Sequence, residues 1–407
     1  MRLLQKTVTI VHLQTALLFL FSVLFLYIGL PSLYKRIAWC DGYALGDWMI
    51  NYEDGGFKRR GLSGSMFIFL SNLTGIYVGK IVFSTIAIFY TSFLGMLIYY
   101  FRKIRFDFSL LLFLLLPTTL LFPINDLYAF GRKEIILFNL FLFFLIAHSK
   151  AIVYSWKFIF FFSFLILLST LFHELVIFYV PYILLVYLRD FIQFKKGSLL
   201  KILLIGLSAF IPALLIFIYG AAVNEGGSWF IFKELGISSN IMEGIFSWPK
   251  EGFGKGQVNA LQFASKNNYS LYFISYVITF FVFIYLLLKN KIGRRIFNQL
   301  LLFHFLLLLL SFPIFFLTID WGRWLHIHFM CMLFLITMYY PRISSVDTIS
   351  FNSVLVKNKF NYLKIIFLFV LMFGFTMKHV DSGFQLGQNN LLVQLRDIFW
   401  IIRNFKF

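Results

Sequence analysis

Long apolar runs recur along the whole chain, and they are the feature that most limits how it can fold. The 407 residues are 60% hydrophobic and only 13% charged, a profile outside the usual range of soluble globular domains. A helix needs about 20 apolar residues to cross a bilayer core of about 30 Å, and its backbone polar groups must be satisfied internally. The sequence therefore predicts an all-α protein, with residues 1–407 forming a single integral membrane domain.

Hydropathy predicts a transmembrane bundle of about eleven helices, with ten and twelve as the limits of that count. The run 158–188 would be about 46 Å long as one helix, well beyond a bilayer core, so we divide it at His173-Glu174 into two short helices. Hydropathy leaves open whether the amphipathic tail 378–407 adds a twelfth span. The predicted spans are 9–30, 78–101, 107–123, 135–149, 158–172, 175–188, 201–220, 271–288, 298–319, 325–340 and 364–377.

The distribution of charge predicts which side of the membrane each loop faces. The first span follows Arg2 and Lys6 and lacks a small-residue cleavage site, so we expect a signal anchor with a cytoplasmic N-terminus. The segments then assigned to the cytoplasm hold about half of the cations but few of the acids, so their net charge is positive, as the positive-inside rule requires. The formal net charge of +19 is explained by this topology, and nucleic acid is excluded as a partner because no soluble basic face exists. The same segments contain only three acids, Asp107, Asp190 and Asp347.

Nearly all other polar clusters fall on the outer side under this topology. Some of them join helices shorter than the usual 20 residues or so. We expect the tips of these hairpins to dip into the bilayer and line a wet cavity, where irregular polar backbone is tolerated. The clusters are the loop 31–77, Asn125-Asp126 with Arg132-Lys133-Glu134, His173-Glu174, the long loop 221–270, and Asp320-Trp321-Gly322-Arg323-Trp324.

The loop 31–77 has the densest charge. Carboxylates in such a loop can accept a proton or hold a divalent cation, and paired arginines bind phosphate oxygens bidentately. The glycines at 55, 56 and 61 suit a close approach of backbone to a ligand. The alternative is a solvated loop whose charges pair with one another. The catalytic candidates here are Asp47, Glu53 and Asp54, and the anion-binding candidates are Arg59 and Arg60.

Two further clusters have a structural and a functional interpretation. Arg132 and Lys133 precede a predicted helix, where the helix dipole favours acids, so their presence indicates anion binding; Asp126 either caps a helix or joins that site. His173 is either a hydrogen-bonded core residue or a general base tuned by Glu174.

The cluster at 320–324 also allows two interpretations. Trp321 and Trp324 offer faces for a sugar ring and Arg323 a cation for a phosphate. Otherwise the segment is an interfacial belt of aromatic and basic side chains, in which Asp320 neutralises Arg323.

Several motif classes are missing from the sequence. We find no zinc-ligand spacing, glycine-rich phosphate loop, Gly-x-Ser-x-Gly elbow or repeat of fixed period. Cys40 and Cys331 match no metal or redox spacing, so we interpret both as unpaired small hydrophobes. No cofactor and no metal site are predicted, although a divalent cation among the acids is left open.

The acidic first outer loop, the arginines in later outer loops, the long outer loop and the total of about eleven helices together resemble the bacterial O-antigen polymerases, the Wzy family, within the GT-C-like glycosyltransferases. The resemblance covers the whole chain in architecture. The chain departs from the family pattern at 221–270, which contains lysines and no arginine. The resemblance implies a multi-pass protein of the bacterial cytoplasmic (inner) membrane, with its active site on the outer face.

The resemblance also implies a reaction at the outer leaflet. A hydroxyl of one lipid-linked repeat unit would attack the anomeric carbon of a chain carried on undecaprenyl pyrophosphate, giving O-antigen or capsule-type polysaccharide. Asp54 or Asp47, with Glu53 or His173 behind them, would accept the proton. The implied stabilisers of the departing pyrophosphate are Arg59, Arg60, Arg132 and Arg323.

The implied partners are the undecaprenyl-pyrophosphate-linked glycan, membrane lipid, a chain-length regulator and a flippase. Two other functions fit the same sequence: a flippase or exporter of the lipid-linked repeat unit, and a lipid-phosphate-dependent glycosyltransferase or ligase. The residues do not specify the sugar, the linkage, the stereochemical course or the oligomeric state.

Overall fold

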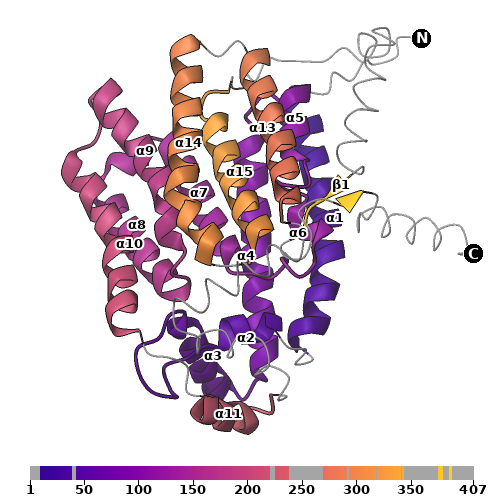
Figure 1. Cartoon of the computed structure of the whole chain (residues 1–407), viewed down its shortest axis with the longest axis vertical. Coiled ribbons are helices and arrows are strands. Elements are labelled where there is room, and N and C mark those ends of the chain that lie inside the picture. Colours follow the sequence, from indigo (N-terminus) through magenta and orange to yellow (C-terminus); the bar gives the residue numbers. More distant parts are fainter. Residues whose placement is uncertain are drawn as a thin grey trace, which may run out of the picture.

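The computed structural model is a bundle of α-helices (Figure 1). It describes residues 10–38, 43–220, 225–237, 269–290, 293–317, 319–340, 342, 375–378 and 385–386. Apart from helices, the described part contains one antiparallel pair of two-residue strands, β1 (Phe375–Thr376) and β2 (Gln385–Leu386). The all-α prediction is therefore confirmed.

The first half of the bundle runs from α1 (Ile10–Ala38) to α8, with a 3-10 turn η1 (Ile152–Tyr154) before α8. The other elements in this half are α2 (Tyr43–Met49), α3 (Gly61–Thr74), α4 (Val78–Phe101), α5 (Phe108–Leu114), α6 (Phe122–Asn125), α7 (Glu134–Ser149) and α8 (Trp156–Phe172). The second half comprises α9 (Val176–Phe194), α10 (Leu199–Tyr219), α11 (Glu225–Glu234), α13 (Leu271–Lys289), α14 (Arg294–Leu317) and α15 (Trp321–Thr337).

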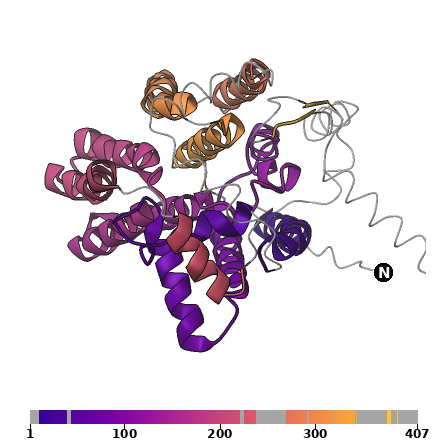
Figure 2. The same cartoon turned by 60° about the horizontal axis from the view of Figure 1, so that its bottom comes forward.

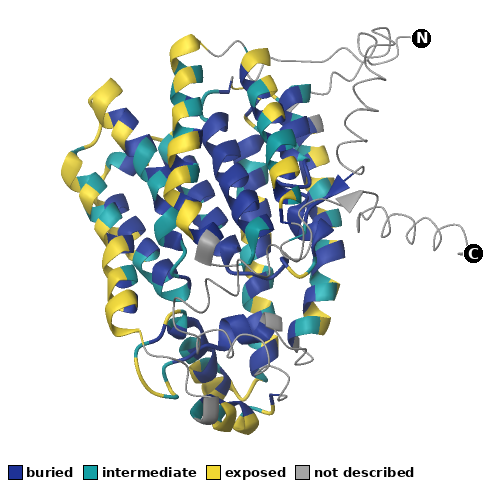
Figure 3. Cartoon of the chain, in the orientation of Figure 1, coloured by how far each residue is buried: buried dark blue, intermediate teal, exposed yellow. Residues whose placement is uncertain are grey.

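Six of the described helices are long and apolar enough to cross a membrane: α1, α4, α9, α10, α13 and α14. Figure 3 shows that α15, which is not one of these six, is buried along nearly its whole length. In contrast, α10 and α14 carry many exposed residues. Exposed side chains such as Phe217 and Leu309 are apolar, as expected of a surface that faces lipid. The structure thus supports a helical transmembrane protein with a central layer around α15.

Short helices form where the sequence predicts hairpins. α7 and α8 have 16 and 17 residues, fewer than the roughly 20 that a span needs. The predicted break at His173-Glu174 is confirmed, because His173 has an extended backbone between α8 and α9. Polar residues stand at one end of each of these short helices: Glu134 begins α7, and His173 follows α8.

The predicted span 107–123 is wrong. α5 ends at Leu114, and only the four-residue α6 follows before α7. Pro117 lacks a backbone N–H and disfavours a continuing helix. The Thr119 hydroxyl donates to the carbonyl oxygens of Phe113 and Leu114, at 2.7 and 2.8 Å, and so replaces helical hydrogen bonds that are lost there.

Other predicted segments differ in part from the structure. The loop 31–77 contains the end of α1 and the helices α2 and α3, and α15 begins four residues before the predicted span 325–340. The described residues of the loop 221–270 include α11. Within the predicted span 364–377, residues 375–376 form β1 and 364–374 lie outside the described residues, as do Asp41, Cys40 and most of the tail 378–407.

One end of the bundle gathers α2, α3 and α11, and we call it the loop end (Figure 1). Figure 2 turns the loop end toward the viewer and brings α11 to the front. α3 packs closely on the end of α2 because residue 64 is glycine: a Cβ there would lie 2.2 Å from the carbonyl oxygen of Ile50. The Gly64 N–H instead donates to that oxygen at 3.1 Å. This contact places the start of α3 beside α2, where the charged residues lie.

Candidate functional site

Arg60 lies at the centre of a cluster of buried charges at the loop end. Its Nη1 donates to Asp47 Oδ1 at 2.6 Å, and its Nε and Nη2 donate to the Glu174 carboxylate at 3.0 and 2.9 Å. The three side chains come from α2, the residue before α3 and the connection between α8 and α9. The structure thus brings together a predicted anion-binding residue and two predicted catalytic residues, through ion pairs.

The backbone of Arg60 is strained. Its φ of 63° and ψ of 7° lie in the left-handed region, which residues other than glycine rarely adopt. Such a conformation costs on the order of 1 kcal/mol or more, and persists only where surrounding contacts enforce it. Residues of this kind are common at functional sites. The ion pairs with Asp47 and Glu174 are contacts that hold the arginine in this position.

Arg323 forms the second centre of the cluster. It lies in the first turn of α15 and pairs with Glu134, the first residue of α7, and with Asp320 Oδ2 at 2.5 Å. Its guanidinium lies 5.0 Å from the ring centroid of Trp324. The neutralisation of Arg323 by Asp320, one of the two interpretations of this segment, is observed. The cation–π contact shows that Trp324 is already engaged within the protein.

His173 lies between the two centres. Its Nδ1 is 3.6 Å from Glu174 Oε2 and its Nε2 is 3.8 Å from Glu134 Oε1. The side chain is buried, and within the described part of the chain neither ring nitrogen has a hydrogen-bond partner. Buried polar atoms are nearly always hydrogen-bonded. His173 therefore lies between two carboxylates, without a close hydrogen bond to either.

Arg132 and Lys133 are the other basic residues of the cluster. Arg132 Nη1 is 4.0 Å from Asp47 Oδ2. Lys133 Nζ donates to Ser63 Oγ at 2.9 Å and to the carbonyl oxygen of Phe172 at 3.1 Å. The two predicted anion-binding residues that precede α7 therefore meet residues of α2, α3 and the end of α8.

Three further sequence candidates, Glu53, Asp54 and Arg59, lie in the segment just before Arg60. Asp54 pairs with Lys58 and accepts from Ser228 of α11, and exposed Glu53 accepts from Ser65 Oγ at 2.7 Å. Arg59 is exposed. These three residues flank a turn in which Gly55 and Gly56 have φ of 96° and 80°, so the glycines are needed for the turn itself.

Asp126 and Trp321 also bond to nearby backbone. Asp126 Oδ1 accepts from the Tyr128 N–H at 3.1 Å, which forms an Asx turn; it does not cap the start of α7, whose N-cap residue is Lys133. Trp321 Nε1 donates to the carbonyl oxygen of Phe315 at 2.7 Å.

The neighbouring charges keep two acids of the cluster, Asp47 and Glu174, ionised. Burial alone would raise the pKa of Asp47, but Arg60, Lys133 and Arg132 hold that pKa well below its usual range. Burial is likewise opposed at Glu174, where Arg60 and His173 keep the pKa of the carboxyl well below its usual range. Carboxylates stabilised in this way are ionised and are weak bases. Their arrangement suits the orientation of Arg60 better than the acceptance of a proton.

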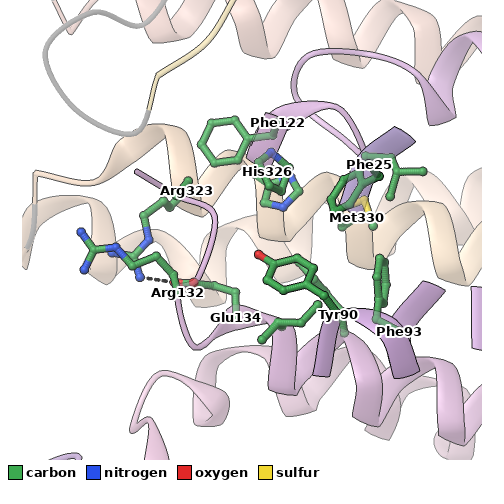
Figure 4. Close-up of a pocket in the computed structure, with 14 residues that line it drawn as sticks. Phe25, Tyr90, Phe93, Phe122, Arg132, Glu134, Arg323, His326 and Met330 are labelled. Atoms are coloured by element: carbon green, nitrogen blue, oxygen red, sulfur yellow. Dashed lines mark hydrogen bonds and ion pairs between the residues drawn. The ribbon is translucent and has the colours of Figure 1, made fainter. Parts of the chain in front are cut away.

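A pocket extends from the charged cluster toward the interior of the bundle (Figure 4). Arg132, Glu134 and Arg323 lie at one end of the view, and aromatic and apolar side chains form the other walls. The cavity is narrow, with a volume of about 20 Å³, which is room for about one water molecule. The pocket therefore combines cations with an apolar interior. The walls include Phe25, Tyr90, Phe93, Phe122, Phe138, His326 and Met330.

Several residues of the site were not predicted. Glu134 was part of a charged cluster but was not assigned a role, and Ser63 and the aromatic walls of the pocket were not recognised. An acid at the first position of a helix is favoured by the dipole, so Glu134 had a detectable signal. Ser63 and the aromatic walls had none, because aromatic residues are abundant throughout the chain. Within the described residues, no group of three or more His, Cys, Asp or Glu side chains is placed to hold a metal ion.

Comparison with known proteins gives no further assignment. No protein-family model, curated protein or solved structure matches the chain. The function is therefore argued from the site alone.

Proposed function

We propose that the chain is a GT-C-like membrane glycosyltransferase that polymerises undecaprenyl-pyrophosphate-linked repeat units at the outer leaflet of a bacterial cytoplasmic membrane. One observation carries this proposal: four segments distant in the sequence bring Arg60, Arg132 and Arg323 around buried carboxylates, beside a pocket with aromatic walls. A lipid-linked diphosphate has the matching chemistry, because it joins a strong anion to an apolar chain.

The arginines suit a diphosphate because they are fixed before it binds. Arg60 is oriented by Asp47 and Glu174, and Arg323 by Glu134 and Asp320. The Nε–H of Arg323 is buried and has no hydrogen-bond partner within the described part of the chain. A guanidinium N–H of this kind can donate to a phosphate oxygen. Fixed donors in a site shielded from water stabilise charge that develops on a leaving group.

The reaction transfers a glycosyl group. An acceptor hydroxyl oxygen bonds to the anomeric carbon of the donor, the bond from that carbon to the pyrophosphate oxygen breaks, and the pyrophosphate leaves on its lipid with the electron pair. The acceptor proton passes to a base on the protein. The unbonded nitrogens of His173 would position a sugar hydroxyl or a phosphate oxygen between the two arginine centres.

Reconstitution tests the proposal. Purified protein in proteoliposomes, given undecaprenyl-pyrophosphate-linked repeat units, is expected to form products of two or more units and to release undecaprenyl pyrophosphate. Arg60→Ala should abolish elongation. Lys157→Ala is the matched control, because this exposed cation lies in the first turn of α8, at the opposite end of that helix from His173.

Other products would indicate the two alternative functions. Movement of single units across the bilayer without elongation would identify an exporter. Transfer of preformed chains to a lipid-core acceptor, without polymerisation of single units, would identify a ligase. In cells, loss of a polymerase leaves single units on the surface, whereas loss of an exporter removes the surface glycan.

A further inference from the structure

Lys133 differs from the other cations of the charged cluster. Its side chain is only 1% exposed, yet no carboxylate oxygen of the described residues lies within 4.0 Å of its Nζ, whereas Arg60 and Arg323 each pair with two acids. The two acceptors at Nζ, Ser63 Oγ and the Phe172 carbonyl oxygen, are both neutral. An ammonium group buried without a carboxylate partner is unfavourable.

The hydrogen bonds at Nζ match a neutral amine. Ser63 uses its own hydrogen to donate to the carbonyl oxygen of Arg60 at 3.0 Å, so its Oγ accepts from Lys133. A neutral amine has two N–H groups and one lone pair, whereas an ammonium has three N–H groups and no lone pair. The two acceptors engage both hydrogens of the neutral form and leave its lone pair unengaged. The ring of Trp48 also lies near this amine, 5.3 Å from Nζ to the ring centroid.

Charged groups from every neighbouring element act on Lys133. Burial is the largest influence and lowers the pKa of Lys133 to about 7; Asp47 of α2 opposes this, and Arg60 before α3 lowers the pKa further. Glu174 after α8 and Glu134 of α7 raise it. A lysine in this range can accept and release a proton near neutral pH, as catalytic lysines do.

We propose that Lys133 is the general base of the glycosyl transfer, an inference that rests on the proposed function. Its lone pair takes the proton of the acceptor hydroxyl while the oxygen bonds to the anomeric carbon and the lipid pyrophosphate departs. The lysine ammonium then returns the proton to water. Asp47 and Glu174 are held as carboxylates by Arg60 and do not compete for it.

The titration of Lys133 can be measured without any substrate. Competitive labelling of the membrane-embedded protein with acetic anhydride, read by mass spectrometry as a function of pH, reports when each amine becomes nucleophilic. We expect a midpoint near pH 7 for Lys133, well below the ordinary lysine value of about 10.4. A Lys133 midpoint near that ordinary value, or no labelling of Lys133 at any pH, would overturn the proposal.

Activity tests the role itself. We expect kcat/KM to rise with pH through 7, and the corresponding limb in kcat to lie at higher pH because a bound diphosphate raises the pKa of a nearby amine. Lys133→Arg places a permanent positive charge at this position and cannot give up a proton, so we expect a loss of about 100-fold or more at every pH. Retention of a tenth of wild-type activity in Lys133→Arg would exclude Lys133 as the base.

A rival base and a failure of the proposed function give different results. If His173 is the base, His173→Gln removes the limb near pH 7; if Lys133 is the base, His173→Gln lowers activity but keeps that limb. If wild-type protein polymerises nothing, the proposed function fails, while the labelling midpoint still decides whether Lys133 is a neutral amine at pH 7.

Discussion

The helices α7 and α9 each connect two buried charge clusters, one at each end of the bundle. α7 begins with Glu134 and has His148 in its last turn, about 21 Å further along. α9 begins two residues after Glu174 and carries Arg189 and Asp190 near its end. The same pair of helices therefore allows a direct comparison between a cluster at the loop end and a cluster at the opposite end.

The cluster at the opposite end satisfies its own atoms. Asp190 Oδ1 accepts from Arg189 Nε at 2.9 Å, and Asp190 Oδ2 lies 2.7 Å both from His148 Nε2 and from the Tyr154 hydroxyl, which donates to it. Arg189 Nη1 donates to the Tyr339 hydroxyl at 2.9 Å. This network joins α7, α9 and the segment after α15, and we interpret it as a structural brace.

The cluster at the loop end leaves atoms unbonded. Within the described residues, Asp47 Oδ2, Arg323 Nε and both ring nitrogens of His173 are buried without a hydrogen-bond partner. Unsatisfied buried groups are expensive and call for an explanation such as ligand binding. Burial and ion pairing are therefore common to both clusters, and the unsatisfied polar atoms are what the loop-end cluster has in addition.

The largest expected effect comes from substituting Arg60 of the loop-end cluster, which should change activity, whereas substituting Arg189 of the opposite cluster should change stability. Arg60→Lys keeps the charge but loses the planar fork that contacts both Asp47 and Glu174, so we expect polymerising activity to fall by about 100-fold or more. Arg189→Lys should lower the thermal midpoint and leave the activity of the folded fraction within about twofold. Comparable activity losses in the two variants would remove the distinction between site and brace.

The brace is tested through stability. Asp190→Asn removes the charge that Arg189 and His148 share, and breaking a buried ion pair typically costs about 3 kcal/mol or more in the free energy of unfolding. Denaturation in detergent, with activity measured on the protein that stays folded, separates stability from function. An Asp190→Asn protein that is as stable as wild type contradicts the structural assignment.

The pH dependence of stability sharpens the contrast at Lys133. Its pKa is about 7 in the folded protein and about 10.4 in an unfolded chain, so between these values only the unfolded state holds the proton. Stability should therefore rise with pH, by about 2 kcal/mol between pH 7.5 and 9. Lys133→Met should lack this increment when unfolding is followed over the same range, and identical slopes for the two proteins would refute the shifted pKa.

The smallest expected effect concerns His173. His173→Gln keeps hydrogen-bonding capacity but changes its geometry, so we expect a loss of about tenfold in kcat/KM, which corresponds to about 1.4 kcal/mol of transition-state stabilisation. His148→Gln, at the other end of α7, is the paired control and should leave kcat/KM unchanged. Equal losses would show that the position of the histidine is unimportant.

Much of the fold was predictable because a membrane-spanning helix is indicated by one continuous apolar stretch of the sequence. The predicted span 78–101 coincides with α4, and the break at His173-Glu174 separates α8 from α9. The span 107–123 failed because Pro117 and the Thr119 hydroxyl end the helix inside an apolar run, and hydropathy does not register either feature.

The site was predictable as a set of residues but not as a set of contacts. Arg60 and Glu174 were both candidates, yet their pairing joins residues 114 positions apart and depends on how the hairpin packs against α3. For the same reason the sequence could not show that Asp54, a preferred candidate for the base, contacts Lys58 and Ser228. The membrane orientation and the resemblance to the O-antigen polymerases stay predictions.

The most direct test of the central claim, that the unsatisfied loop-end cluster binds a diphospholipid, is the thermal midpoint of the purified protein with and without undecaprenyl pyrophosphate. A ligand present at about 100 times its Kd stabilises the folded state by about 2.7 kcal/mol. We predict an increase in midpoint for wild type and Lys157→Ala, and none for Arg60→Ala or Arg323→Ala, each relative to its own ligand-free state. Equal increases in all four proteins would contradict the account.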